Sequence, residues 1–238
     1  MARGNAIGKV RIVNTIAVNG APGPAIDVYD ISRPDSSTKP LITNLQYGQV
    51  SDYVTPHGWV SGDTRSNLYV LPAGSIKPSG PLQGGNIDNS GFTAGDQLTL
   101  TLFGSELGFG ISQIAEAGPR VRPGMGMDPT PPAGQGLLLV RAAVSRAMNS
   151  PEPVMYLSID GACPNVGGGV EGRYPVAPDD HTLALVTSPP GMGLTQAMCA
   201  RKAPVESVNA HVDAGQRIDV IVYGPVDALK LLATPVPH

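Results

Sequence analysis

Short segments of alternating apolar and polar residues recur along the whole chain, and glycine or proline separates most of them. Alternation with a period of two is typical of strands that bury one face, whereas an amphipathic helix needs a period near 3.6. Few segments show the helical period, and proline or glycine interrupts most of these. The pattern predicts an all-β protein with under about a tenth of its residues in helix, against a usual share near a third.

The strongest internal signal is a repeat of one turn-and-strand pattern. Residues 94–104 have the sequence AGDQLTLTLFG and residues 214–224 have AGQRIDVIVYG, so each runs from a turn through alternating residues to an aromatic–glycine pair. One such match could arise by chance, but five in the same order indicate a duplication. The other matches pair residues 10–13 with 138–141, 26–30 with 155–160, 49–53 with 170–174, and 67–71 with 182–186.

The repeat predicts two tandem immunoglobulin-like antiparallel β-sandwich domains, at residues 1–117 and 136–238. Each domain would hold about seven short strands, as in sandwiches of this size. Residues 118–135 are rich in proline and glycine, which predicts an extended linker between the domains. In this alignment Tyr53 and Tyr174 are equivalent, which favours a structural role over a ligand contact for both.

Composition excludes several classes of partner. The net charge is -3 and only 15% of the residues are charged, so no basic footprint for nucleic acid is visible. No apolar run approaches the roughly 18–20 residues that a membrane-spanning helix needs. The sequence therefore predicts no nucleic-acid partner and no membrane insertion. No signal peptide is present in this chain, and we expect that one has been removed, with the protein located outside the cell or in the cell envelope.

The two cysteines, Cys163 and Cys199, lie in segments with the character of loops. A single disulfide in an oxidising compartment explains such a pair, and two unrelated buried thiols are the alternative. No further cysteine or suitably spaced histidine is present to complete a zinc site. We predict the disulfide.

Several of these segments resemble the bacterial domain-of-unknown-function family numbered 4397. The resemblance lies in VRIVN at 10–14, PAIDVY at 24–29, YGQVSDY at 47–53 and PAGS at 72–75. It covers residues 8–116 well and 136–234 more weakly. It implies a β-sandwich, often in tandem, in exported or envelope-anchored bacterial proteins, and it implies no activity. The long loops at 75–93 and 191–212 and the two cysteines depart from the family pattern, so a special role would lie there.

Catalytic motifs are missing from the sequence. It contains no nucleophile elbow, phosphate loop or dinucleotide fingerprint. We therefore predict no catalytic residue, no cofactor and no metal site. The one ionisable cluster is Asp179, Asp180 and His181, which we interpret as a turn with a solvated histidine. The alternative is a metal or acid–base site that His181 shares with His57.

A binding surface is the remaining candidate. Trp59 is the only tryptophan and follows His57, so it either contacts a partner or closes one end of a sandwich. The candidate surface therefore comprises Trp59, His57, Asp179, Asp180 and His181. The polar segment at 86–90 is interpreted as a self-capping loop, with calcium binding as the alternative.

Three hypotheses for function follow. The first is a non-enzymatic exported or cell-surface module that binds or scaffolds, with a surface polymer or a protein as its partner. The second is a self-associating structural subunit of a fibre, coat or matrix, in which copies of the chain form a homo-oligomer. The third is a hydrolase whose site is assembled from loops in three dimensions.

Overall fold

The protein is almost entirely β-structure. The computed structural model describes residues 8–30, 39–56, 67–75, 86–88, 97–105, 108–117, 130–145, 151–166 and 169–236. Strands account for 57% of the structure, and the described residues include one short helix, which confirms the predicted all-β class. The chain divides into two compact units, Met1–Arg122 and Pro123–His238. Most of the predicted linker, residues 118–129, lies outside the described residues.

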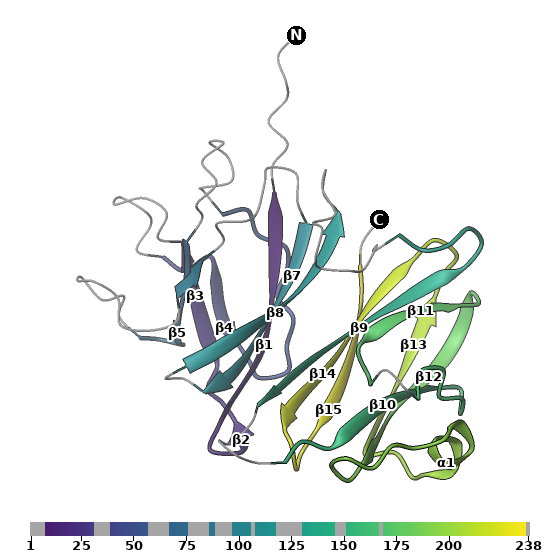
Figure 1. Cartoon of the computed structure of the whole chain (residues 1–238). Helices are drawn as coiled ribbons and strands as arrows, with labels where there is room; N and C mark the ends of the chain where they lie inside the picture. The colour runs from purple at the N-terminus through teal and green to yellow at the C-terminus, as the bar shows by residue number, and fades with distance from the viewer. Residues whose placement is uncertain are drawn as a thin grey trace. The chain divides into compact units, whose positions relative to one another are not determined.

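Unit 1 contains two four-stranded sheets (Figure 1). Apolar side chains from both sheets, such as Ile12, Val28 and Leu100, form a single core. The segment at Asn86–Asp88, interpreted from sequence as part of a loop, pairs as a strand with Asn67–Pro72. One sheet has the order β2 (Ala21–Pro22), β1 (Lys9–Val18), β7 (Gln97–Ser105), β8 (Gly108–Ala117), and the other β4 (Ile42–Leu45), β3 (Ile26–Asp30), β5 (Asn67–Pro72), β6 (Asn86–Asp88).

Unit 2 contains a four-stranded and a three-stranded sheet around its own core. Leu138 and Val220 from the first sheet pack with Leu157 and Leu185 from the second. The first sheet has the order β11 (Gly172–Val176), β9 (Gly136–Ser145), β14 (Arg217–Pro225), β15 (Lys230–Pro235), and the second β10 (Val154–Ile159), β12 (Asp179–Ser188), β13 (Glu206–Val212).

Strand register agrees with the sequence alignment of the two units, while the duplication itself stays a prediction. In unit 1, β1 pairs with β7 so that Val10 lies opposite Leu98. In unit 2, β9 pairs with β14 so that Leu138 lies opposite Ile218. The sequence alignment matched these same positions. Both pairs are parallel rather than antiparallel, because in each unit the chain crosses to the other sheet and returns before the later strand forms.

The sequence alignment pairs Tyr53 with Tyr174, but the strand pairing in the structure differs from it by one residue. Val54, not Tyr53, bridges to Val10, while Tyr174 lies opposite Leu138 at the matching place in unit 2. A shift of one residue moves a strand side chain to the other face. Tyr174 is accordingly buried at 6% exposure, whereas Tyr53 is only partly buried and stacks under the Arg11 guanidinium, 5.2 Å from its ring centre.

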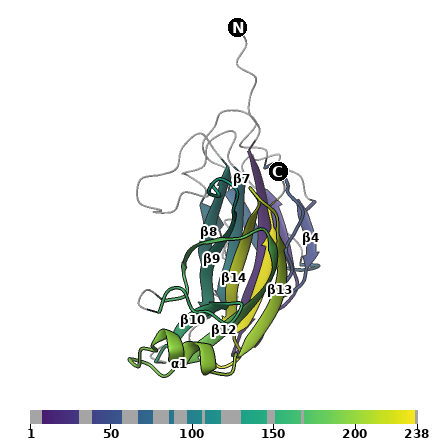
Figure 2. The same ribbon diagram turned by 90° about the vertical axis from the view of Figure 1, so that its right-hand side faces the viewer.

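Residues 191–212 were predicted as a loop but carry two elements, the helix α1 (Gln196–Arg201) and the strand β13. The Thr195 side chain caps the helix by accepting a hydrogen bond from the Met198 amide. β13 pairs with β12 over seven residues and buries Ala210 and Val212. Two views show α1 beside β10 and β12 (Figures 1 and 2).

Candidate binding surface

The structure describes only part of the surface predicted from sequence. His57 and Trp59 lie outside the described residues, and so does any site that His181 would share with His57. Asp179, Asp180 and His181 form the start of strand β12. The Asp179 side chain accepts a hydrogen bond from the Asp180 amide at 2.8 Å, as expected for a capping aspartate.

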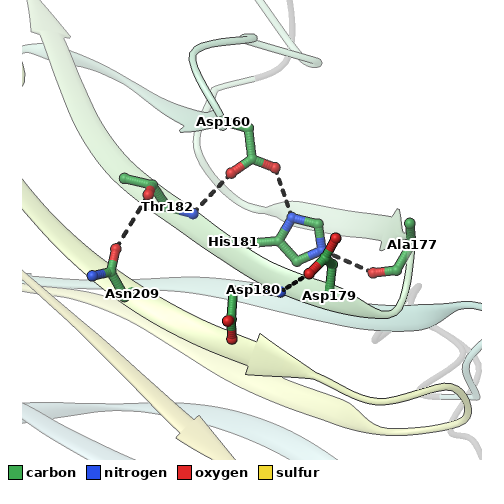
Figure 3. A network of polar contacts seen from close by, with 7 residues as sticks. All are labelled: Asp160, Ala177, Asp179, Asp180, His181, Thr182 and Asn209. Carbon is green, nitrogen blue, oxygen red and sulfur yellow. Dashed lines mark hydrogen bonds and ion pairs between the residues drawn. The ribbon is translucent and has the colours of Figure 1, made fainter.

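His181 is buried rather than solvated, which corrects the sequence interpretation. Its side chain is 8% exposed. Its Nδ1 lies 2.7 Å from Asp160 Oδ2 and its Nε2 lies 2.8 Å from the Ala177 carbonyl oxygen (Figure 3). The second oxygen of Asp160 accepts from the Thr182 amide at 2.8 Å. The network joins the end of β10 to the turn between β11 and β12.

Both ring nitrogens of His181 face acceptors, so each must carry a proton to make its hydrogen bond. The ring then has no lone pair with which to accept a proton from a substrate. Burial alone lowers the pKa of His181, but the Ala177 carbonyl and Asp160 outweigh burial and raise the pKa above 6.5. This geometry suits a structural ion pair.

A second histidine, His211, lies on the exposed side of β13 between two carboxylates. Its Nδ1 is 2.8 Å from Asp180 Oδ1 and its Nε2 is 3.3 Å from Asp213 Oδ1. Hydrogen bonds to Asp180 and Asp213 raise the pKa of His211. Among the described residues, no group of three or more His, Cys, Asp or Glu side chains has the geometry to hold a metal ion.

The predicted disulfide is present, and it joins α1 to the segment that follows β10 in the same unit. Cys163 and Cys199 are bonded, with their Cα atoms 6.2 Å apart, and both are 1% exposed. They belong to a small second core, with Tyr156, Val186 and Leu194, on the face of β10 and β12 opposite the main core. Tyr156 accepts a hydrogen bond from the Leu194 amide at 3.0 Å. We refer to residues 191–205 as the α1 lobe.

The α1 lobe carries the exposed apolar side chains. The large hydrophobic residues that are exposed in the described part of the chain are Met192 at 55%, Met198 at 51% and Val205 at 50%. A lobe with a buried underside and an apolar outer side is typical of a contact surface.

The lobe also differs from the rest of unit 2 in charge. It contains Arg201 and Lys202 and no acidic residue, whereas unit 2 as a whole has more carboxylates than cations. Neither cationic side chain forms an ion pair with any residue that the structure describes. The lobe therefore presents apolar side chains next to unneutralised positive charge.

Comparison with known proteins identifies no family. The chain matches no protein-family model, and no curated protein matches it in sequence. The resemblance to family 4397 stays a prediction. The structure described here contains no helix long and apolar enough to cross a membrane among the residues it covers.

Solved structures that resemble the chain do so weakly. The Bacillus anthracis TIE protein is 11% identical with a TM-score of 0.23, over 93% of this chain and 34% of that one, so this chain spans about a third of it. A family 41 carbohydrate-binding module from streptococcal virulence factors, which recognises α-glucan, is 8% identical with a TM-score of 0.26, over 95% and 97%. A Bacteroides ovatus protein assigned to cell adhesion is 10% identical with a TM-score of 0.23, over 99% and 97%. At these TM-scores the likeness carries no argument about function.

The sequence pointed to residues 191–212 as the place of a special role, but it did not predict the helix α1 there or the partners of His181. The signal for the lobe was readable, because no acidic residue occurs from Thr182 to Val205. Asp160 and His181 are 21 residues apart and meet only through strand pairing, so no local pattern links them.

Proposed function

We propose that the protein is a non-enzymatic extracellular contact module that binds a partner macromolecule through the α1 lobe. The observation that carries the proposal is the location of Met192, Met198 and Val205 on one short segment. Methionine side chains are flexible and polarisable, so they adapt to a partner surface. The disulfide fixes the segment before binding, which lowers the entropy lost on association.

The charge of the lobe indicates an acidic partner. No carboxylate in the described part of the chain pairs with Arg201 or Lys202, so a negatively charged polymer or protein would gain favourable electrostatic contacts there. Extracellular location is part of the proposal, and the Cys163–Cys199 bond supports it because disulfides persist in oxidising compartments.

Self-association is the second candidate, and one observation favours it. The side chains of Asp180 and Asp213 are 82% and 66% exposed on the same unit, so a second copy could offer an acidic surface to the lobe. Contact between two different surfaces of identical chains generates rings or filaments.

The test replaces Met192 and Met198 by glutamine together. We expect binding to immobilised acidic polymers and proteins to weaken by about tenfold or more, because each methionine loses buried apolar contact area. The melting temperature should change little, since both side chains are exposed. Ser207→Ala, an exposed change outside the lobe, is the matched control.

Light scattering over a range of protein concentrations separates the two candidates. Self-association is supported if the average molar mass of the parent protein rises with concentration while the double variant keeps the mass of a monomer. Unchanged binding and unchanged mass in the double variant would reject the lobe as the contact surface. Turnover of an ester, glycoside or peptide that is lost in His181→Ala would instead indicate a hydrolase.

A further inference from the structure

A depression of about 310 Å³ lies in unit 2 where the end of β10 approaches β11. These are outer strands of opposite sheets, so the depression opens at one edge of the unit. Its volume is at the lower end of the range typical of small-molecule sites. None of its lining residues belongs to the α1 lobe. They are Ile159, Pro164, Asn165, Arg173, Tyr174 and Pro175.

Cross-links hold both walls of this pocket in place. Pro164 and Asn165 directly follow Cys163, which the disulfide fixes. On the other side, His181 pairs with Asp160, which directly follows Ile159. The same ring bonds the carbonyl oxygen of Ala177, two residues after Pro175.

The buried tyrosine of the pocket is fixed as well. The Tyr174 hydroxyl donates to the Val170 carbonyl at 3.0 Å. A Cβ atom on Gly172 would come within 3.0 Å of the tyrosine ring, so glycine permits the close approach. A pocket held in this way loses little entropy when a ligand binds.

Arg173 supplies an available cation at the mouth of the pocket. One guanidinium nitrogen donates to the Thr130 carbonyl, and no described carboxylate pairs with the group. The nearby Glu171 is engaged elsewhere, because its carboxylate accepts from the Ala142 amide at 3.0 Å. An arginine held at one nitrogen still offers donors in a planar fork that suits a carboxylate.

The rest of the lining indicates what carries that carboxylate. Pro164 and Pro175 present exposed ring surfaces, while Tyr174 is 6% exposed and forms the floor. The Asn165 amide donates to the Gly169 carbonyl at 3.5 Å and offers its side-chain oxygen as an acceptor. Ring surfaces with a few polar groups suit the C–H face and hydroxyls of a sugar ring. A peptide added as a strand along β11 is disfavoured, because Pro175 has no amide hydrogen to donate.

We propose that this pocket binds a hexuronic acid residue of an acidic polysaccharide, with Arg173 holding its carboxylate. The sugar ring lies against the two proline rings, and the side-chain oxygen of Asn165 accepts a hydrogen bond from a sugar hydroxyl. This site is separate from the contact surface proposed on the α1 lobe, so an experiment can reject one proposal without rejecting the other.

Titration calorimetry with a galacturonic acid trisaccharide tests the site, with the neutral galactose trisaccharide as the matched ligand. We expect saturable binding of the acidic trisaccharide and binding at least tenfold weaker of the neutral one. Arg173→Gln should weaken acidic binding by about tenfold to a hundredfold, and Arg173→Lys by less. Lys9→Gln removes an equal charge from an exposed position in unit 1, outside both proposed sites, and should leave this binding unchanged.

Amide chemical shifts of the parent protein provide a measurement that does not depend on a variant folding. Shifts on adding the acidic trisaccharide should centre on Asn165, Arg173 and Tyr174. The proposal is overturned if the acidic trisaccharide does not bind, if both trisaccharides bind equally, or if the shifts centre on the α1 lobe. Saturable binding of an acidic peptide in its place would assign the pocket to a protein partner and would also overturn it.

Discussion

His181 lies between a carboxylate and a carbonyl oxygen, and this position makes its charged form the stable one. Charge-assisted hydrogen bonds are stronger than neutral ones, and the imidazolium makes two hydrogen bonds here. The same contact lowers the pKa of Asp160 below 3.8, chiefly through the hydrogen bond from His181. The two residues therefore stabilise the folded state as an ion pair.

This ion pair predicts a specific pH dependence of stability. The contribution of Asp160 is present above its unfolded pKa of 3.8 and is lost as pH falls through its lowered folded pKa. The contribution of His181 is complete below its unfolded pKa of 6.5 and is lost as pH rises through its raised folded pKa. The ion pair therefore contributes its full stabilisation between the two unfolded pKa values, at pH 3.8 to 6.5. Half-exposure of Asp160 limits the effect to about 1 kcal/mol.

Denaturant unfolding of the parent and of His181→Gln at pH 5.5 and pH 9 measures the effect. We expect the free-energy difference between the two proteins to be larger at pH 5.5. His211→Gln is the control, because its ring is 62% exposed and solvent screens its ion pairs. An equal difference between the parent and His181→Gln at both pH values would show that folding does not raise the pKa of His181.

Among the elements, the α1 lobe depends on contacts with the outer face of β10. The helix has six residues and would not be stable alone, because helices this short are marginal in water. The disulfide, the second core and the hydrogen bond from the Leu194 amide to Tyr156 together hold it. If this account is right, a small change at Tyr156 should loosen the lobe and leave the main core intact.

Replacing Tyr156 by phenylalanine tests that dependence. The change leaves the Leu194 amide buried without its acceptor, at a cost of about 1–3 kcal/mol. Hydrogen exchange in residues 191–205 should become faster, while exchange in β9 and β14 stays slow. Tyr53→Phe is a matched control, because the Tyr53 hydroxyl is buried and has no hydrogen-bond partner among the described residues, so its loss should cost little. Equal acceleration in the lobe and in β9 would contradict a locally held lobe.

The elements differ in how well the sequence predicted them, for physical reasons. β7 and β14 alternate clearly because one face of each packs into a core, so their repeat was visible. β13 also alternates, but with Ser207, Asn209 and His211 on its exposed side it has few residues with high strand propensity. α1 is shorter than two helical turns, so it shows no apolar period.

For the whole molecule, the predicted duplication agrees with the strand framework better than with the candidate sites. The aligned positions Gly104 and Gly224 share a positive φ, of 104° and 101°, as a duplication predicts. The α1 lobe and the disulfide have no matching sequence in unit 1, and the alignment places Asp52 of unit 1 opposite the pocket residue Arg173. They depend on one unit's own loops and on long-range pairing, which a repeat pattern does not encode.

The two units have separate cores, so a cross-link within one should stabilise that unit selectively. The disulfide spans 36 residues of unit 2 and leaves unit 1 uncrosslinked. Replacing Cys163 and Cys199 by serine together removes the restraint on the unfolded chain, for which the entropy model gives about 4 kcal/mol. Hydrogen exchange followed by mass spectrometry in mild denaturant should show β9, β12 and β14 losing protection while β1, β3 and β7 keep theirs. Reduction of the parent protein should give the same pattern, which separates the loss of the bond from any effect of buried serine. Equal loss of protection in both units would mean that they unfold as one cooperative structure despite their separate cores.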